Sequence, residues 1–179
     1  MNKFNGILFL KKYGLKTVDL INYDDIVRDD FIIKNGLSLR LSSLKNNSID
    51  VNLPSIHNCR DKNVIKKFYN RYSKKYKILI HETVMPSMIG SISKYKVNCS
   101  SIIVIEIFKN FEKRKQGIVQ ERIKFDIIGE QYLNFNGCNK KDYIILGNIV
   151  KQIPFDSFDL EFVKQDDYFI FTDFYSINL

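Results

Sequence analysis

The sequence is poor in the residues that form disulfide frameworks and metal clusters. It contains three cysteines and two histidines among 179 residues. The cysteines are far apart and form no CxxC pair. His57-Asn58-Cys59 is the closest approach to a metal-binding fragment, and it has no second half, whereas a zinc site needs about four ligands. We therefore expect reduced thiols and no structural zinc.

Long apolar runs are also missing. No run approaches the ~20 residues that cross a bilayer, and Ile7–Leu10 is too short for a secretory signal. We therefore expect a cytoplasmic protein with no membrane partner. Disorder is excluded as well, because 45% of the residues are hydrophobic, including 14 Phe and 10 Tyr. The length, without repeats or linkers, predicts a single compact domain over residues 1–179.

Self-sufficient catalytic motifs are absent too. There is no Walker A loop, no GxGxxG after a strand, no GxSxG elbow and no HExxH. His57 and His81 are separated in sequence and neither belongs to a recognisable nucleophilic triad. Any functional signal must therefore be distributed along the chain.

Basic residues, by contrast, are in excess. The formal net charge is +8 and the isoelectric point is near 9.3, and such a surface attracts polyanions. The one dense cluster comprises Lys62, Lys66, Lys67, Arg71, Lys74, Lys75 and Lys77. We favour a solvated helix face as its explanation. The alternative is a non-catalytic module that binds nucleic acid or an acidic partner, with interleaved aromatics such as Phe68, Tyr69 and Tyr72 stacking on single strands.

Periodicity and turn residues predict an α+β fold. Gly14 should end a first helix, and Asp61 should cap another whose apolar stripe is Val64, Phe68 and Tyr72. Residues 42–58 look like a loop. We expect helices at about 3–13, 61–76 and 142–152, with a helical turn at 24–25. We expect an extended segment at 17–21 and strands at about 31–33, 37–41, 77–82, 90–94, 101–108, 116–125, 132–135, 158–163 and 168–171.

Four segments carry a resemblance to a known family. Lys3 stands eleven residues ahead of Gly14-Leu15-Lys16-Thr17-Val18, and Ser38-Leu39-Arg40-Leu41-Ser42-Ser43 is followed by residues 50–54. Further on come residues 78–84 with 90–93, and Asp159-Leu160-Glu161-Phe162 with residues 170–175. In order and spacing these segments resemble the ATP-grasp nucleotide-binding domain of phosphoenolpyruvate synthase and pyruvate phosphate dikinase.

The resemblance implies a two-lobed α+β fold of antiparallel sheets with flanking helices. The smaller lobe would cover about 1–76 and the larger about 77–179. It implies ATP and Mg²⁺ as cofactors, with Lys3 and Arg40 on the phosphates and Arg40 also catalytic. Glu82 and Val84 would bind the adenine.

The metal ligands by this resemblance are Glu161 and Asp173. They lie on the two strands of a predicted hairpin, so the carboxylates could converge on one ion if the register places both on the same face. Mg²⁺ prefers one or two carboxylates together with phosphate oxygens and waters.

The sequence also departs from the family. Tyr175 replaces the closing arginine, and no counterpart of the phosphohistidine carrier or of the phosphoenolpyruvate-binding barrel is present. His81 is no substitute, because it lies in a predicted buried strand. The leading hypothesis is ATP- and Mg²⁺-dependent phosphoryl transfer or carboxylate activation. The acceptor would be an unidentified small molecule or a separate carrier protein, and the alternative within this fold is a degenerate nucleotide-binding subunit.

Overall fold

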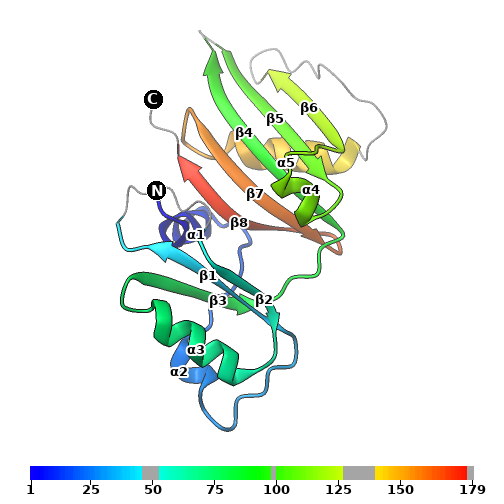
Figure 1. Ribbon diagram of the computed structural model, residues 1–179. Coiled ribbons are helices and arrows are strands. Elements are labelled where there is room, and N and C mark those ends of the chain that lie inside the picture. The colour runs from blue at the N-terminus through cyan, green and yellow to red at the C-terminus, as the bar shows by residue number, and fades with distance from the viewer. Residues whose placement is uncertain (46–52, 98–99, 127–139, 177–179) are drawn as a thin grey trace. The chain divides into compact units, whose positions relative to one another are not determined.

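The computed structural model describes residues 1–45, 53–97, 100–126 and 140–176 (Figure 1). The chain divides into two compact units, Met1–Met85 and Pro86–Leu179. Strand β3 (Tyr76–Glu82), which we had expected to begin the larger lobe, pairs along its whole length with β1 (Leu37–Ser43) and lies in the first unit. Within the described ranges, no helix is long and apolar enough to cross a bilayer.

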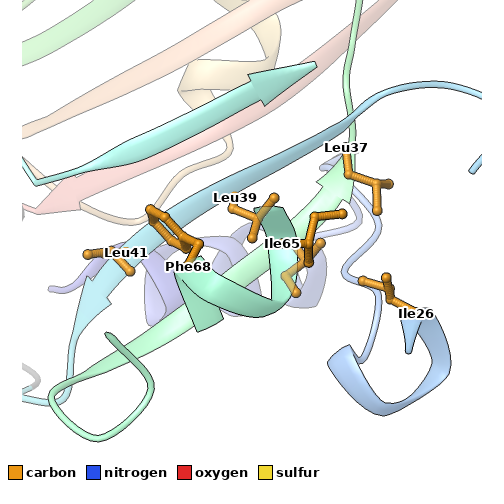
Figure 2. Close-up of a cluster of buried hydrophobic side chains, with 7 residues drawn as sticks. Ile26, Leu37, Leu39, Leu41, Ile65 and Phe68 are labelled. Atoms are coloured by element: carbon orange, nitrogen blue, oxygen red, sulfur yellow. The ribbon is translucent and has the colours of Figure 1, made fainter. Parts of the chain in front are cut away.

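The first unit is built on an antiparallel sheet of three strands in the order β2-β1-β3, with β2 at Ser55–Cys59. Successive side chains of a strand alternate between faces, so Leu37, Leu39 and Leu41 of β1 point to the same side. They form a buried cluster with Ile26 of α2 (Tyr23–Ile26) and with α3 (Lys62–Tyr72), which covers this face (Figure 2).

Helix α3 confirms the predicted cap but not the predicted stripe. The Asp61 carboxylate accepts a hydrogen bond from the Asn63 backbone at 2.8 Å, which fixes the start of the helix. The inward residues are Ile65, which is fully buried, and Phe68, whereas Val64 is 40% exposed. The stripe therefore follows i, i+3 and i+7 from Ile65 to Tyr72. The helix ends at Tyr72 rather than near Tyr76, because residue 76 already belongs to β3.

Helix α1 (Lys3–Lys12) docks on the opposite face of the same sheet. The Asn2 side chain caps it, and Gly14 ends it at a φ of 72° that favours glycine, as predicted. The Phe4 backbone amide donates to Ser42 Oγ at 3.2 Å, and Asn2 Nδ2 donates to the Ser43 carbonyl at 2.8 Å. The start of α1 is thereby fixed at the end of β1.

Two expectations for the first unit were wrong. Residues 31–33 form no strand, and Ile32 is 75% exposed in a loop. The expected extended segment at 17–21 is non-helical, with a bridge at Thr17, and its Ile21 amide donates to the Ile80 carbonyl at 2.8 Å. The expected loop 42–58 contains edge strand β2. Its largely exposed pattern lacks the apolar alternation by which a strand is recognised.

The second unit is an antiparallel sheet of five strands in the order β6-β5-β4-β7-β8. The strands are β4 (Met88–Val97), β5 (Ser100–Phe108), β6 (Glu121–Asp126), β7 (Phe158–Gln165) and β8 (Tyr168–Ser176). The predicted strand at 101–108 and the closing hairpin are confirmed. The predicted strand at 116–125 begins only at Glu121, because residues 116–120 form the turn and loop that follow α4 (Phe111–Lys115). The strand expected at 132–135 lies outside the described residues.

Helix α5 (Lys140–Lys151), predicted at 142–152, covers one face of this sheet (Figure 1). Tyr143 Oη donates to Glu121 Oε2 of β6 at 3.0 Å, and Lys164 Nζ of β7 donates to both Asp142 oxygens. On the face beneath the helix, the described strands present apolar side chains that are fully buried, such as Ile92, Ile105, Leu160 and Phe174.

Gly90 lies on this buried face, where there is no room for a side chain. A Cβ there would overlap the Phe162 ring and lie 2.8 Å from the Glu106 carbonyl oxygen. The apolar face is therefore closely packed around Gly90.

Candidate functional site

A row of polar side chains crosses the sheet of the second unit on the face opposite α5. Taken from β6 to β8, successive cross-strand partners are Arg122, Glu106, Ser91, Glu161 and Asp173. A row of this kind arises only when the register of every strand agrees, because a shift of one residue would place apolar side chains there.

Glu161 and Asp173 are direct cross-strand partners. The register changes immediately afterwards to Phe162 opposite Phe171, so that Thr172 is the extra residue of a β-bulge. Bulges redirect side chains and are frequent beside active sites. Asp173 is 1% exposed and the Glu161 side chain 18%. Like charges placed opposite one another are destabilising, so this pair calls for a cation.

One cation at this point comes from α4. Arg114 forms an ion pair with Glu161, and their side chains are 28% and 18% exposed. Asn110 caps the helix by accepting from the Lys113 amide at 2.9 Å. Gly117, at a φ of 68°, ends it with its own amide donating to the Arg114 carbonyl at 2.9 Å. Figure 1 shows α4 and α5 on opposite sides of the sheet.

Sequence reasoning missed Arg114 and the polar neighbours of Glu161. Arg122 donates to Glu106 Oε1 from Nε at 2.7 Å, and Ser93 Oγ donates to Asp159 Oδ1 at 2.6 Å. The sequence feature that could have indicated these polar neighbours was the alternation in β4 and β7, where polar residues recur at every second position. The basic run between β5 and β6 gave no indication of which side chain turns toward the sheet.

Lys3 and Arg40 belong to the first unit. Lys3 is the first residue of α1, and both of its neighbours in sequence bond to the end of β1. Arg40 lies on the same face of β1 as Ser42, to which the Phe4 amide donates. Both side chains are half-buried. The structure thus places the two cations in one region of this unit.

Glu82 and Val84 lie at the end of β3 and just beyond it. The exposed Glu82 carboxylate accepts from Asn35 Nδ2 at 3.2 Å, and the Glu82 carbonyl is 2.7 Å from His81 Nδ1. An adenine base that donated a hydrogen bond to the Glu82 carbonyl would share that oxygen with the His81 ring. His81 is buried at 8% exposure, as expected for its strand. Val84 is half-buried.

Lys94 and Tyr23, whose pKa values are shifted, lie outside the polar row. Burial lowers the pKa of Lys94, which lies on the α5 side with Nζ 3.4 Å from the Ile153 carbonyl, and nearby Asp156 partly offsets this. Burial also raises the pKa of Tyr23, as does Tyr69, whose ring stacks on it at 3.6 Å. Neither group faces the carboxylate pair.

The donor set of the carboxylate pair suits Mg²⁺. Its atoms are all oxygens, and Mg²⁺ takes one or two carboxylates while phosphates and waters complete its shell. Among the described residues no group of three or more His, Cys, Asp or Glu side chains could hold a metal by itself. An ion here would therefore need further oxygens, from waters or from a bound ligand. That the residues of the two units serve a single nucleotide site stays a prediction.

No protein-family model matches the sequence, and no curated protein matches it significantly. Solved structures do match. D-alanine–D-alanine ligase from Helicobacter pylori gives a TM-score of 0.65 at 15% identity, covering 99% of this chain and 54% of the ligase. The dinucleotide-forming acetyl-coenzyme A synthetase 1 of Ca. Korarchaeum cryptofilum gives 0.63 at 14% identity, covering 100% of this chain and 93% of that one.

A third match is N5-carboxyaminoimidazole synthase from Aspergillus clavatus, with a TM-score of 0.55 at 16% identity over 99% of this chain and 44% of the synthase. This chain thus spans about half the length of the ligase and of the synthase. These neighbours are ATP-grasp enzymes. The finer resemblance to phosphoenolpyruvate synthase stays a prediction. The predicted fold class is confirmed, because the chain has the α+β architecture of two antiparallel sheets with flanking helices that characterises the ATP-grasp fold.

Proposed function

We propose that this protein binds ATP with Mg²⁺ and uses it to activate a carboxylate for ligation. The observation that carries the proposal is the Glu161–Asp173 pair, two shielded carboxylates at a bulge in the last hairpin of an ATP-grasp fold. Among the neighbours, N5-carboxyaminoimidazole synthase was solved with ADP and a ribonucleotide, and carboxyaminoimidazole ribonucleotide synthase with ATP.

Each residue has a defined part in the proposed site. Glu161 and Asp173 would hold Mg²⁺, and the ion would supply positive charge that neutralises the phosphates. Arg40 grips phosphate oxygens through its planar guanidinium, and Lys3 contributes a point charge. The backbone around Glu82 and the side chain of Val84 hold the adenine. Positioning and charge neutralisation account for most of the catalysis of phosphoryl transfer.

The proposed reaction has two steps, phosphorylation of the acceptor carboxylate and then transfer of its acyl group. An oxygen of the acceptor carboxylate attacks the γ-phosphorus, and the bond from that phosphorus to the bridging oxygen breaks, so that ADP leaves with the electron pair. A nucleophile then attacks the acyl carbon of the acyl phosphate, inorganic phosphate leaves, and the nucleophile releases its proton to solvent. A histidine on a separate carrier protein is the other acceptor that we consider, and it would need only the first displacement.

Thermal denaturation tests the proposal at low cost. We expect millimolar ATP with Mg²⁺ to raise the melting temperature, because a ligand that binds only the folded state stabilises it by about 2.7 kcal/mol at a hundred times its Kd. ATP with EDTA and Mg²⁺ alone should give much smaller shifts. An unchanged melting temperature at saturating ATP and Mg²⁺ would count decisively against nucleotide binding.

A second candidate function belongs to α3 and the residues after it. No acidic residue occurs between Lys62 and Lys77, and Lys66, Lys67 and Arg71 are exposed. The interleaved rings pack within the unit, since Tyr69 stacks on Tyr23 and Phe68 contacts Tyr72 with ring centroids 4.8 Å apart. Charge rather than base stacking would therefore carry any binding of a polyanion.

Reversing these charges tests the second candidate. If the surface binds a polyanion, Lys66→Glu with Lys67→Glu and Arg71→Glu should lower the affinity for a labelled oligonucleotide. The slope of log K against log salt should also fall by about 0.7 for each lost phosphate contact. Fluorescence anisotropy from low to moderate salt gives both quantities. Lys11→Glu with Lys12→Glu, which changes exposed lysines on α1, is the control. Equal binding by all variants would eliminate this surface.

A further inference from the structure

The ion pair between Arg114 and Glu161 occupies one of the two proposed metal ligands. The guanidinium of α4 contacts Glu161 Oε1, and both side chains are largely shielded from water. Glu161 and Asp173 lie directly opposite one another on paired strands, and Arg114 forms an ion pair with the first of them. A divalent cation and a guanidinium on the same carboxylate oxygens would repel one another, and strongly so in a site that excludes water.

We propose that Arg114 holds the Glu161 carboxylate in the metal-free protein and exchanges it for a phosphate oxygen of the nucleotide when metal and nucleotide bind. This inference rests on the proposed function and adds a residue to it. Arg114 thereby has two roles, as the counter-ion of Glu161 and as a ligand of the nucleotide's phosphates.

The chemistry of the side chain suits such an exchange. A guanidinium donates parallel hydrogen bonds to two oxygens of either a carboxylate or a phosphate, so one group serves both partners. In the second partnership its charge would face the nucleotide's phosphates, while the metal neutralises Glu161 and Asp173. Neither state then leaves a shielded charge without an opposite charge beside it.

The local backbone permits the exchange without rearrangement of the sheet. Asn110 and Gly117 fix the two ends of α4, and the Gln120 amide donates to the Ile107 carbonyl at 2.8 Å, which anchors the chain again before β6. The movement is therefore one of the long Arg114 side chain. The neighbouring Lys113 Nζ donates to Gln116 Oε1 at 3.4 Å, within the helix region itself.

The experiment compares Arg114→Gln with Arg122→Gln in two binding measurements. Arg122 is the matched control, since it lies on the same sheet face and pairs with Glu106. The first measurement is the Kd of Mn²⁺ for nucleotide-free protein, from the electron paramagnetic resonance signal of free Mn²⁺. The second is the Kd of a fluorescent ATP analogue at saturating Mg²⁺.

We expect Arg114→Gln to bind Mn²⁺ about tenfold more tightly and the nucleotide about tenfold more weakly, as loss of a charge-assisted contact implies. Arg122→Gln should leave both constants within about twofold of the wild type, the scale of an exposed pair. Arg114→Lys keeps the positive charge but loses the two parallel hydrogen bonds of the guanidinium, so both of its dissociation constants should be intermediate. Opposite changes in the two constants are the signature of exchange.

The remaining outcomes separate the two proposals. If the wild type binds both ligands but Arg114→Gln leaves both constants unchanged, or shifts them in the same direction, the Arg114 inference is overturned and the proposed function stands. A lower melting temperature of the variant with unchanged constants also overturns it, because a purely structural ion pair would behave so. If the wild type binds neither Mn²⁺ nor the nucleotide, both proposals fail.

Discussion

The double variant Glu161→Gln with Asp173→Asn should lose the rise in melting temperature that ATP and Mg²⁺ give the wild type. The two amides keep the shape of the side chains but remove both negative charges from the carboxylate pair. Because Mg²⁺ depends on carboxylates for its protein ligands, the metal-bound nucleotide loses its anchor. At concentrations a hundred times the wild-type Kd, the lost stabilisation is about 2.7 kcal/mol.

Two comparisons test whether the lost response could instead come from a destabilised fold or from the removal of any carboxylate on this sheet face. In the absence of ligand the double variant should melt close to the wild type, because relief of the opposed like charges offsets the loss of the Arg114–Glu161 ion pair. Glu106→Gln, on the same face and paired with Arg122, should retain the full shift. If the double variant kept an undiminished response to ATP and Mg²⁺, the metal assignment would be refuted.

The second large effect concerns stability. Asp142→Ala should lower the free energy of unfolding by about 3–5 kcal/mol, since removing one member of a buried ion pair leaves the other charge without its partner. Lys164 Nζ lies 2.8 and 2.9 Å from the two Asp142 oxygens, and the side chains are 16% and 7% exposed. A domain is stable by only about 5–15 kcal/mol in total, so the loss should be evident in urea denaturation.

Replacing both partners distinguishes the ion pair from simple packing. Asp142→Leu with Lys164→Met should recover most of the lost stability, because apolar groups of similar volume often substitute for a buried pair. Asp156→Ala is the exposed control. Its carboxylate is 78% exposed and 3.7 Å from Lys96, and the change should cost less than about 1 kcal/mol. A cost below 1 kcal/mol for Asp142→Ala would show that the pair contributes little to the fold.

Features encoded by neighbouring residues were predictable from the sequence. Asp61 caps α3 and Gly14 ends α1 because each effect requires only a few adjacent residues. The closing hairpin was equally accessible, since apolar strands flank the turn before Tyr168. The fold class followed from the resemblance of segments spread along the whole chain and is confirmed by the architecture.

Where the prediction failed, distant contacts decide the structure. Ser55–Cys59 carries little apolar signal and becomes a strand because β1 offers it a hydrogen-bonding edge. The residue of α3 that turns inward is Ile65 rather than Val64, and the sheet beneath the helix determines this. Both residues are apolar and β-branched, so the sequence did not distinguish them.

The candidate site shows the same division. The sequence by itself indicated only that Glu161 and Asp173 lie on the paired strands of one hairpin. The register set by the turn would place Thr172 opposite Glu161, and the bulge at Thr172 brings Asp173 to that position instead. Only the tertiary structure decided that Arg114 meets them. The order β6-β5-β4-β7-β8 brings a helix between β5 and β6 to a strand 47 residues further along the chain. The pairing of β4 with β7, which are separated by more than sixty residues in the sequence, joins these segments, and no local pattern specifies it.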